Sequence, residues 1–313
     1  MATYPVPAPS IANNVISASR FLNSPTLVAR RVPQLVDLRY VGGQLLRGRE
    51  DAEGGAISYE QAESMFADAA LEVVAPGGEY SLTTAQLGPA GLAKVAKYGK
   101  DTLVTDELVK RSNRANLRGT AVDRNLAKLA NSAAAFVDQA VISTIASAVT
   151  QTAAAAAKWT VAGTTSILLD IQLAVAAITG NNQGYNPDTL LVDDTVWAYL
   201  SANATIANMM ARENPSNAVY TGRFANLAGL DVVHVPVGNL PGGVNTNAWV
   251  LDSTMLGFIA TEDLQDGYTR AGDIVETKSM RADENDAWRV RARANFVPVV
   301  TEPGAGYKIT AVN

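Results

Sequence analysis

The most regular pattern of hydrophobic and polar positions lies between residues 120 and 148. Thr120-Ala-Val-Asp123 has the form of a helix-capping box, and about thirty residues at 1.5 Å each would give a helix of roughly 45 Å. Within this stretch, apolar or small residues recur at helical spacing, at Val122, Leu126, Leu129, Ala133, Val137, Ala140, Thr144 and Ala148. We therefore predict one long spine helix. A separate, shorter helix is predicted from Thr105-Asp106-Glu107, where a hydroxyl cap precedes acids.

Strand and helix patterns are mixed through the rest of the chain, which predicts an α+β fold. Two helices are expected at Ile167–Thr179 and Thr195–Leu200. Arg289–Val300 alternates charged and apolar residues, as a long, half-exposed strand does. Further strands are predicted at Leu92–Tyr98, Thr102–Thr105, Thr189–Val192, Leu230–Val235 and Ala248–Leu251.

Residues 40–60 consist of two strand-like runs joined by a charged, glycine-bearing segment, which predicts an extended hairpin. At about 3.4 Å per residue, ten residues reach roughly 34 Å, beyond the roughly 20 Å radius of gyration expected for such a chain. An isolated hairpin is marginal in water, so we expect a neighbouring subunit to support it. Both signs of charge would lie at its tip, either pairing with that neighbour or forming a solvated turn, at Arg47, Arg49, Glu50, Asp51 and Glu53.

The segments on either side of this hairpin carry weaker patterns. The first thirty-odd residues hold five prolines and no sustained periodicity, which predicts an extended arm ordered only by contact. After the hairpin, a short helix is expected at 60–70, and strands at 71–75 and 79–84 on either side of a Pro76-Gly77-Gly78 turn.

Composition narrows the class of protein. The 313 residues are 48% hydrophobic, which supports a large core, and the net charge of -5 gives no electrostatic basis for gripping nucleic acid. The chain has no cysteine, so disulfides and thiolate chemistry are excluded. The first residues lack a signal-peptide pattern, and no uninterrupted run reaches the roughly 18 apolar residues of a membrane span. We expect a protein made and kept in a cytoplasm.

Candidate catalytic and metal-binding residues are few. The sole histidine, His234, lies in an alternating strand pattern and is expected to be structural. Asp193-Asp194 and Asp283-Glu284-Asn285-Asp286 could hold a hard cation, although turn and helix-cap roles explain them as well. No nucleotide-binding glycine motif is present. The sequence therefore predicts no enzyme and no catalytic, cofactor or metal site, with tryptophans serving as core anchors at Trp159, Trp197, Trp249 and Trp288.

The order of elements resembles the major capsid protein of tailed double-stranded DNA phages, which implies the Hong Kong 97-type fold. The motifs that carry the resemblance are, in order, the proline-rich arm, the hairpin, Lys94–Lys100 running into Thr105-Asp-Glu-Leu108, the spine helix, Tyr185-Asn-Pro-Asp-Thr-Leu-Leu-Val192, Leu227–Pro236, Trp249-Val-Leu-Asp252, Arg291–Val300 and Pro303–Ile309. The resemblance implies four regions: an N-terminal arm (1–35), an extended β-hairpin loop (36–85), a peripheral domain with the spine helix (86–159 and 271–313) and an axial domain (160–270).

The resemblance implies a structural protein that self-assembles, in the bacterial host cytoplasm, into the icosahedral virion shell around phage double-stranded DNA. Implied partners are further copies in hexameric and pentameric capsomers, a separate scaffolding protein, a portal and a decoration protein, with neither sequence-specific DNA binding nor membrane contact. Some relatives cross-link their shells through a lysine of the extended loop, but residues 36–62 contain no lysine. Two alternatives stay open: an encapsulin-like nanocompartment shell around a cargo enzyme, and a carboxylate-based hydrolase.

Overall fold

The computed structural model of the chain describes residues 40–61, 73–80, 82, 88–114, 120–161, 163–203, 206, 226–236, 246–264, 266–270 and 274–313. Contacts among them define two compact units. The first comprises residues 97–134 and 263–295, and the second comprises residues 40–96, 135–262 and 296–313. The helix α5 (Thr120–Ala148) and the strand β13 (Ala287–Val300) each contribute residues to both units. The predicted N-terminal arm and most of the predicted helix 60–70 lie outside the described residues.

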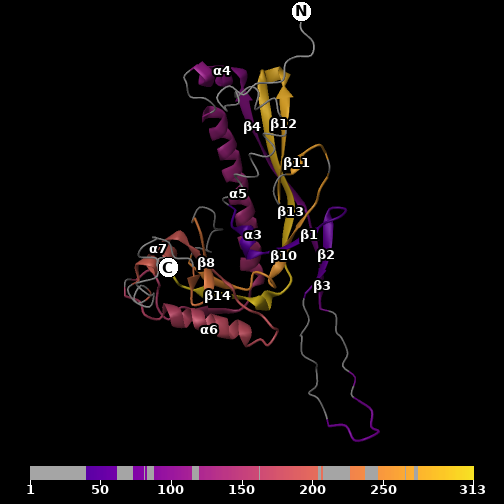
Figure 1. Cartoon of the computed structure of the whole chain (residues 1–313), viewed down its shortest axis with the longest axis vertical. Helices are drawn as coiled ribbons and strands as arrows, with labels where there is room; N and C mark the ends of the chain where they lie inside the picture. The colour runs from indigo at the N-terminus through magenta and orange to yellow at the C-terminus, as the bar shows by residue number, and fades with distance from the viewer. Residues whose placement is uncertain are drawn as a thin grey trace, which may run out of the picture. The chain divides into compact units, whose positions relative to one another are not determined.

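The first unit is built around antiparallel strands (Figure 1). Strand β12 (Val275–Ala282) pairs antiparallel with β13 from Val275 opposite Ala294 to Ala282 opposite Ala287, and the short helix η3 (Asp283–Asn285) closes the turn. Strand β11 (Thr269–Arg270) pairs with β12, and β4 (Ala96–Thr105) pairs with β13. Helix α4 (Asp106–Arg114) follows β4 directly. Its first turn is capped as predicted, because the Thr105 hydroxyl accepts a hydrogen bond from Leu108 N at 3.3 Å.

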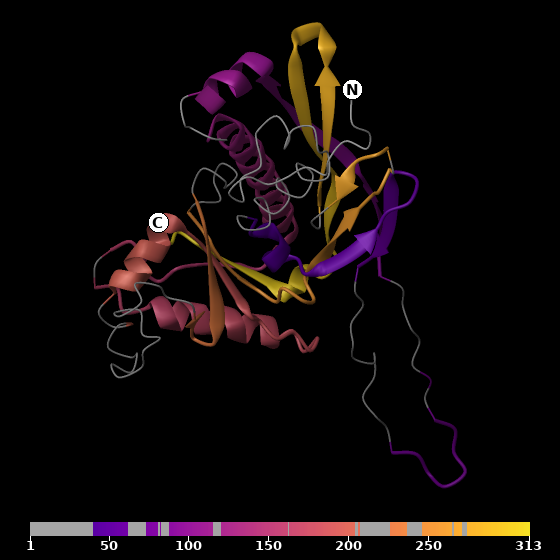
Figure 2. The same cartoon turned by 45° about the horizontal axis from the view of Figure 1, so that its top comes forward.

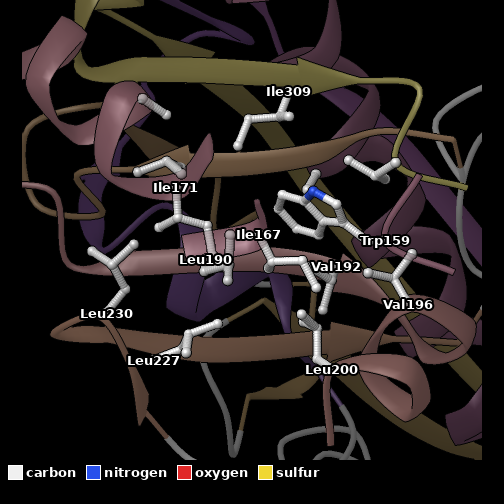
Figure 3. Close-up of a cluster of buried hydrophobic side chains, with 14 of the residues drawn as sticks. Trp159, Ile167, Ile171, Leu190, Val192, Val196, Leu200, Leu227, Leu230 and Ile309 are labelled. Atoms are coloured by element: carbon white, nitrogen blue, oxygen red, sulfur yellow. The ribbon is translucent and has the colours of Figure 1, made fainter. Parts of the chain in front are cut away.

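The second unit contains a mixed sheet with the strand order β5-β14-β9-β6-β8-β7. Its strands are β5 (Thr152–Ala154), β6 (Thr189–Asp193), β7 (Asn226–Leu227), β8 (Leu230–Val235), β9 (Ala248–Leu251) and β14 (Gly306–Thr310), the last preceded by the short helix η4 (Pro303–Ala305). Helices α6 (Ile167–Thr179) and α7 (Asp194–Ala202) pack against this sheet (Figure 2). Figure 3 shows the core between them, where Trp159, Ile171 and Ile309 meet strand residues such as Leu190 and Val192.

The long predicted helix is confirmed as α5, which runs from Thr120 to Ala148. Its residues Leu126, Val137, Val141 and Ile145 are all buried. By length and composition alone, Arg124–Ala148 is the one helix in the described part of the chain that could cross a membrane, and 44% of its most apolar window is buried. The prediction that no segment reaches that length therefore holds only for uninterrupted apolar runs. A buried core helix passes the same test, and the buried face of α5 accounts for its apolar character.

The strand β13 differs from its prediction in burial. The alternation of arginines and apolar residues predicted a half-exposed strand, but residues Ala292–Phe296 are all buried. The reason is that β13 lies inside its sheet, where it pairs with β10 (Gly257–Thr261), β12 and β4. Its buried arginine, Arg293, is satisfied there by the equally buried Glu276 of β12, whose Oε2 lies 2.8 Å from Arg293 Nε. Strands β5, β10, β11 and β12 had no counterpart in the sequence prediction.

The predicted hairpin over residues 40–60 was wrong in its pairing. Strand β1 (Gly48–Asp51) pairs parallel with β10, whereas β2 (Ala56–Glu60) pairs antiparallel with β3 (Ala90–Lys94). Only one bridge, Glu53 to Ala56, joins the two runs across the Gly54-Gly55 turn. The physical reason is burial: Ala52, Ile57 and Tyr59 pack with Phe258, Ala260 and Val299 in one apolar cluster, which stabilises each run more than a free two-stranded hairpin would.

The segment between β2 and β3, residues 61–89, is described in part. The predicted turn is present, since Gly78 N donates to Ala75 O at 2.8 Å and Gly77 has a φ of 86° that favours glycine. Of the predicted strands on either side, the described residues 73–75, 79, 80 and 82 belong to no strand, and the others lie outside the described residues. A Val- and Tyr-rich pattern predicted strands here, but such residues form a strand only where a partner strand is available.

Candidate assembly surface

The chain enters β1 through a short helix, α3 (Gly42–Leu45), that is fixed from both sides. On one side, Oδ1 of Asp138 in α5 accepts hydrogen bonds from Val41 N at 2.9 Å and Gly42 N at 2.7 Å. On the other, Leu45 and Leu46 are fully buried. Burial raises the pKa of Asp138 to about 6, although the two backbone N–H groups oppose the shift. Asp138 is thus a buried acid whose contacts position the segment before β1.

Arg47 contacts its own chain, although its side chain is about half exposed. Its backbone N donates to Ser253 O at 3.1 Å, and its Nη1 lies 3.7 Å from Asp188 Oδ2. The same Asp188 accepts hydrogen bonds from Ser253 N and Ser253 Oγ at 2.9 and 2.6 Å. This network joins the start of β1 to the turn between β9 and β10, so β1 begins at a fixed point.

Strand β1 is an edge strand of its sheet and pairs with β10 on its inner side. Arg49 turns back on its own backbone, because its Nη1 donates to Leu46 O at 2.6 Å and to Gly48 O at 2.9 Å. Glu50, Asp51 and Glu53 are exposed, and none of the three forms an ion pair with any described residue. The predicted contact residues therefore line a strand edge and the turn after it; all five are exposed, and the two arginines contact their own chain while the acids form no such ion pair. Their role between subunits stays a prediction.

The pair β2–β3 forms the base of the segment 61–89 (Figure 1). The end of the pair that is farther from this segment is closed by hydrogen bonds from Val95 N to Gly55 O at 2.9 Å and from Gly55 N to Glu262 Oε1 at 3.0 Å. At the other end, Gln61 N donates to Pro89 O at 3.2 Å. The ladder thus fixes both ends of the segment against the rest of the second unit.

Three large apolar side chains of this segment are almost completely exposed. Their relative exposures are 103% for Val73, 82% for Tyr80 and 95% for Leu82. Each therefore has hardly any contact with its own chain, and exposed apolar groups gathered on one segment are typical of an interaction site. The sequence prediction overlooked these residues because it assigned them to strands, whose alternate side chains would have been buried.

The candidate catalytic and metal-binding residues form stacking, helix-capping and ion-pair contacts within the fold. His234 lies on β8, its ring stacked on Trp197 with centroids 4.8 Å apart and its Nε2 3.9 Å from Asp194 Oδ1. Asp193 caps helix α7, accepting from Val196 N at 2.6 Å, and burial raises the pKa of its carboxyl. The acids of residues 283–286 belong to η3, where Asp283 accepts from Arg281 Nε at 3.1 Å. No group of three potential metal ligands occurs among the residues that the structure describes.

The tryptophans divide into two kinds. Trp159 and Trp249 are buried, and the indole N–H of Trp159 donates to Asp170 Oδ2 at 3.0 Å, so the predicted core role is confirmed for both. Trp197 packs on the core of the second unit while remaining partly exposed. Trp288 is not a core anchor: it lies half-buried under the guanidinium of Arg281, 5.5 Å from the ring centroid. The alternation along β13 places it opposite Arg281 of β12.

Comparison with known proteins agrees with this architecture. The model of a family described as phage capsid protein matches residues 90–309. The capsid of cyanophage P-SCSP1u is similar in structure, with a TM-score of 0.58 and 16% identity over 88% of each chain. The mature capsid of bacteriophage PhiM1 gives a TM-score of 0.55 and 10% identity over 88% of this chain and 87% of that one. No curated protein matches the sequence.

The fold is therefore that of the Hong Kong 97-type capsid proteins. A virus-like particle from Pyrococcus furiosus shares it, with a TM-score of 0.51 and 9% identity over 91% of this chain and 98% of that one, so the fold alone does not separate viral shells from similar particles. The family match does: the chain belongs to the phage capsid protein family. It is a major capsid protein that forms the virion shell as a homo-oligomer, and it is a structural protein rather than an enzyme.

Proposed function

We propose that this protein closes an icosahedral shell of hexameric and pentameric capsomers around phage double-stranded DNA, and that it does so in the cytoplasm of the bacterial host. In this proposal, residues 1–35 are the N-terminal arm and residues 36–85 the extended loop. The peripheral domain comprises 86–159 and 271–313, and the axial domain comprises 160–270. A scaffolding protein, a portal and a decoration protein stay predictions from the resemblance.

The observation that carries the proposal is the exposed apolar segment between β2 and β3. Val73, Tyr80 and Leu82 remain uncovered while both ends of their segment are fixed by the β2–β3 ladder. Covering an apolar side chain of this size contributes about 1.5–3 kcal/mol. In a homo-oligomeric shell the available cover is a neighbouring copy, so we assign this segment to the contact between subunits.

The exposed acids of β1 and of the turn after it supply a second, weaker contact. Glu50, Asp51 and Glu53 present negative charge at the edge of a sheet, where an exposed ion pair contributes only about 0–1 kcal/mol. Such contacts steer and orient subunits more than they hold them. Because each subunit repeats every contact around a ring, individually modest interactions add up to a stable shell.

The test is to replace residues 62–88 with an Asn-Gly turn, which makes a two-residue connection between Gln61 and Pro89 at the paired ends of β2 and β3. The ladder and its apolar cluster are retained, so we expect a folded subunit with an unchanged circular dichroism spectrum. We expect no closed shells by negative-stain microscopy, because the exposed apolar segment is gone.

A full-length variant, V73S/Y80S/L82S, separates apolar contact from loop length. It keeps the segment and removes only its apolar side chains, so it should also lose assembly. Normal closed shells from both variants would overturn the assignment of the contact. By contrast, deleting residues 44–57 would be uninformative, because it removes the buried Leu45 and Leu46 and strand β1.

A further inference from the structure

Within the first unit, residues of β4 and α5 line a cavity of about 470 Å³ that is open to solvent. That size lies in the range of roughly 300–1,000 Å³ found for small-molecule sites. We propose that this cavity binds phosphate groups of the nucleic-acid backbone inside the shell, and so marks a surface that faces the genome. The inference rests on the proposed function, since it requires a shell that encloses DNA.

Two lysines give the cavity its charge. Lys100 of β4 and Lys128 of α5 both line it and are both exposed. Neither forms an ion pair within the described part of the chain, so both ammonium groups are available to a ligand. The chain as a whole carries a net charge of -5, which makes a cavity with two unpaired cations a local exception.

Neutral polar side chains complete the lining. Asn125, Asn131 and Thr102 supply amide and hydroxyl groups that can donate to phosphate oxygens. Ser132 also lines the cavity, but its hydroxyl already donates to Lys128 O at 2.9 Å. Such contacts between polar side chains and phosphate oxygens position a nucleic acid without reading its sequence.

Among the described side chains that line the cavity or belong to Arg124–Ala148 of α5, each acid is neutralised or buried. Asp101 is the one acid in the lining, and Arg291 binds its carboxylate through two hydrogen bonds of 2.6 and 2.8 Å. Arg289 lies 3.7 Å from the same carboxylate. Between Arg124 and Ala148, the only acid of α5 is Asp138, which is fully buried. A phosphate approaching the cavity along α5 therefore meets Arg124 and Lys128 but no exposed acid of that stretch.

The experiment measures binding of the unassembled full-length subunit, whose inner surface is accessible, to a short DNA duplex by fluorescence anisotropy over a range of salt concentrations. Each neutralised phosphate contributes about 0.9 to the slope of log affinity against log salt. We expect K100A/K128A to reduce that slope by about 2, and K100R/K128R to retain it. The matched control is K94A/K158A, which removes the same charge at two exposed lysines elsewhere and should leave the slope unchanged.

An equal reduction in K100A/K128A and K94A/K158A, or no reduction in either, would overturn the proposal. Inorganic phosphate, added at matched ionic strength, distinguishes the sources of the ligand. Competition by phosphate that is lost in K100A/K128A supports a phosphate-binding site. Phosphate binding with an unchanged DNA slope would overturn the nucleic-acid assignment. Negative-stain microscopy of the wild-type chain, expressed alone and together with its genomic neighbours, keeps the two proposals apart, because a chain that stays monomeric under every condition refutes the proposed function whatever the slope.

Discussion

At the scale of single residues, Asp138 is a buried acid that links the long helix α5 to the segment before β1. It is fully buried, and its Oδ1 is the acceptor for both backbone N–H groups that precede β1. Its Oδ2 is buried without a hydrogen-bond partner within the described part of the chain. Only one of the two carboxylate oxygens therefore accepts hydrogen bonds. The destabilisation of the charged form by burial outweighs these two hydrogen bonds, so the pKa rises to about 6.

A raised pKa makes stability depend on pH in a definite direction. The folded state holds its proton up to about pH 6 while the unfolded chain releases it near 3.8, so the contribution of Asp138 to stability falls as pH rises between these values. At about 1.4 kcal/mol for each pH unit between them, the loss reaches roughly 3 kcal/mol by neutral pH. We expect D138N to remove this pH dependence, measured by urea denaturation of the unassembled subunit from about pH 4 to 7.

The matched control for this measurement is D51N, which changes an exposed acid of β1 to its amide. Its stability should follow the pH dependence of the wild-type chain. The absolute stability of D138N is less informative, because its amide N–H₂ would lie where Oδ2 has no partner. A D138N variant with the same slope as the wild type between pH 4 and 6 would contradict the role given to Asp138.

At the scale of elements, the sequence predicted local structure well and pairing poorly. Helix α6 and strands β8 and β9 have the predicted limits, because helical and strand periodicity depend on near neighbours. The partner of β1 is β10, more than 200 residues away, and alternation along one strand contains no information on which strand pairs with it. The glycine-bearing turn between β1 and β2 favoured the wrong, local pairing.

The same limit applies to the candidate assembly surface. The sequence identified which charged residues surround β1, but the direction of each side chain depends on distant groups. Asp188 holds Arg47, and the buried Phe258 lies against Gly48, where any side chain would collide with it. The exposure of Val73, Tyr80 and Leu82 was not predictable either, since it depends on what the rest of the chain leaves uncovered.

The pairing of β12 with β13 permits a prediction about a buried ion pair. Arg293 is 2% exposed, and it contacts Glu276 Oε2 at 2.8 Å, Asp266 Oδ2 at 3.0 Å and the ring of Tyr268 at 3.5 Å from its centroid. We expect R293L to destabilise the subunit by about 3–5 kcal/mol, because Glu276 would remain buried without a counter-charge. R293L/E276L should recover most of that loss in urea denaturation, since the pair itself gains little over apolar packing.

The exposed ion pair between Arg281 and Asp106 serves as the control for the substitutions of Arg293 and Glu276. It has comparable geometry, with contacts of 2.7 and 2.8 Å, but both side chains are about one-third exposed, so D106N should change stability little. A double variant R293L/E276L that is no more stable than R293L would show that Arg293 acts through Asp266 and Tyr268 rather than through Glu276.

At the scale of the whole molecule, the subunit combines a buried core with surfaces that its own residues leave unsatisfied. The core cluster around Trp159 and Ile171 stabilises the subunit itself, whereas in the proposed assembly the segment 61–89 and the acidic edge of β1 would contribute only between copies. Such an assembly needs no reactive site, since closure follows from repeated contacts related by symmetry.

The most direct test of this account is the particle size of the wild-type chain, expressed alone and together with its genomic neighbours, by sedimentation and negative-stain microscopy. We predict closed shells, or rings of subunits that close only in the presence of a partner protein. A chain that remains a monomer under every condition would contradict the account, because the exposed Val73, Tyr80 and Leu82 would then have no partner to cover them.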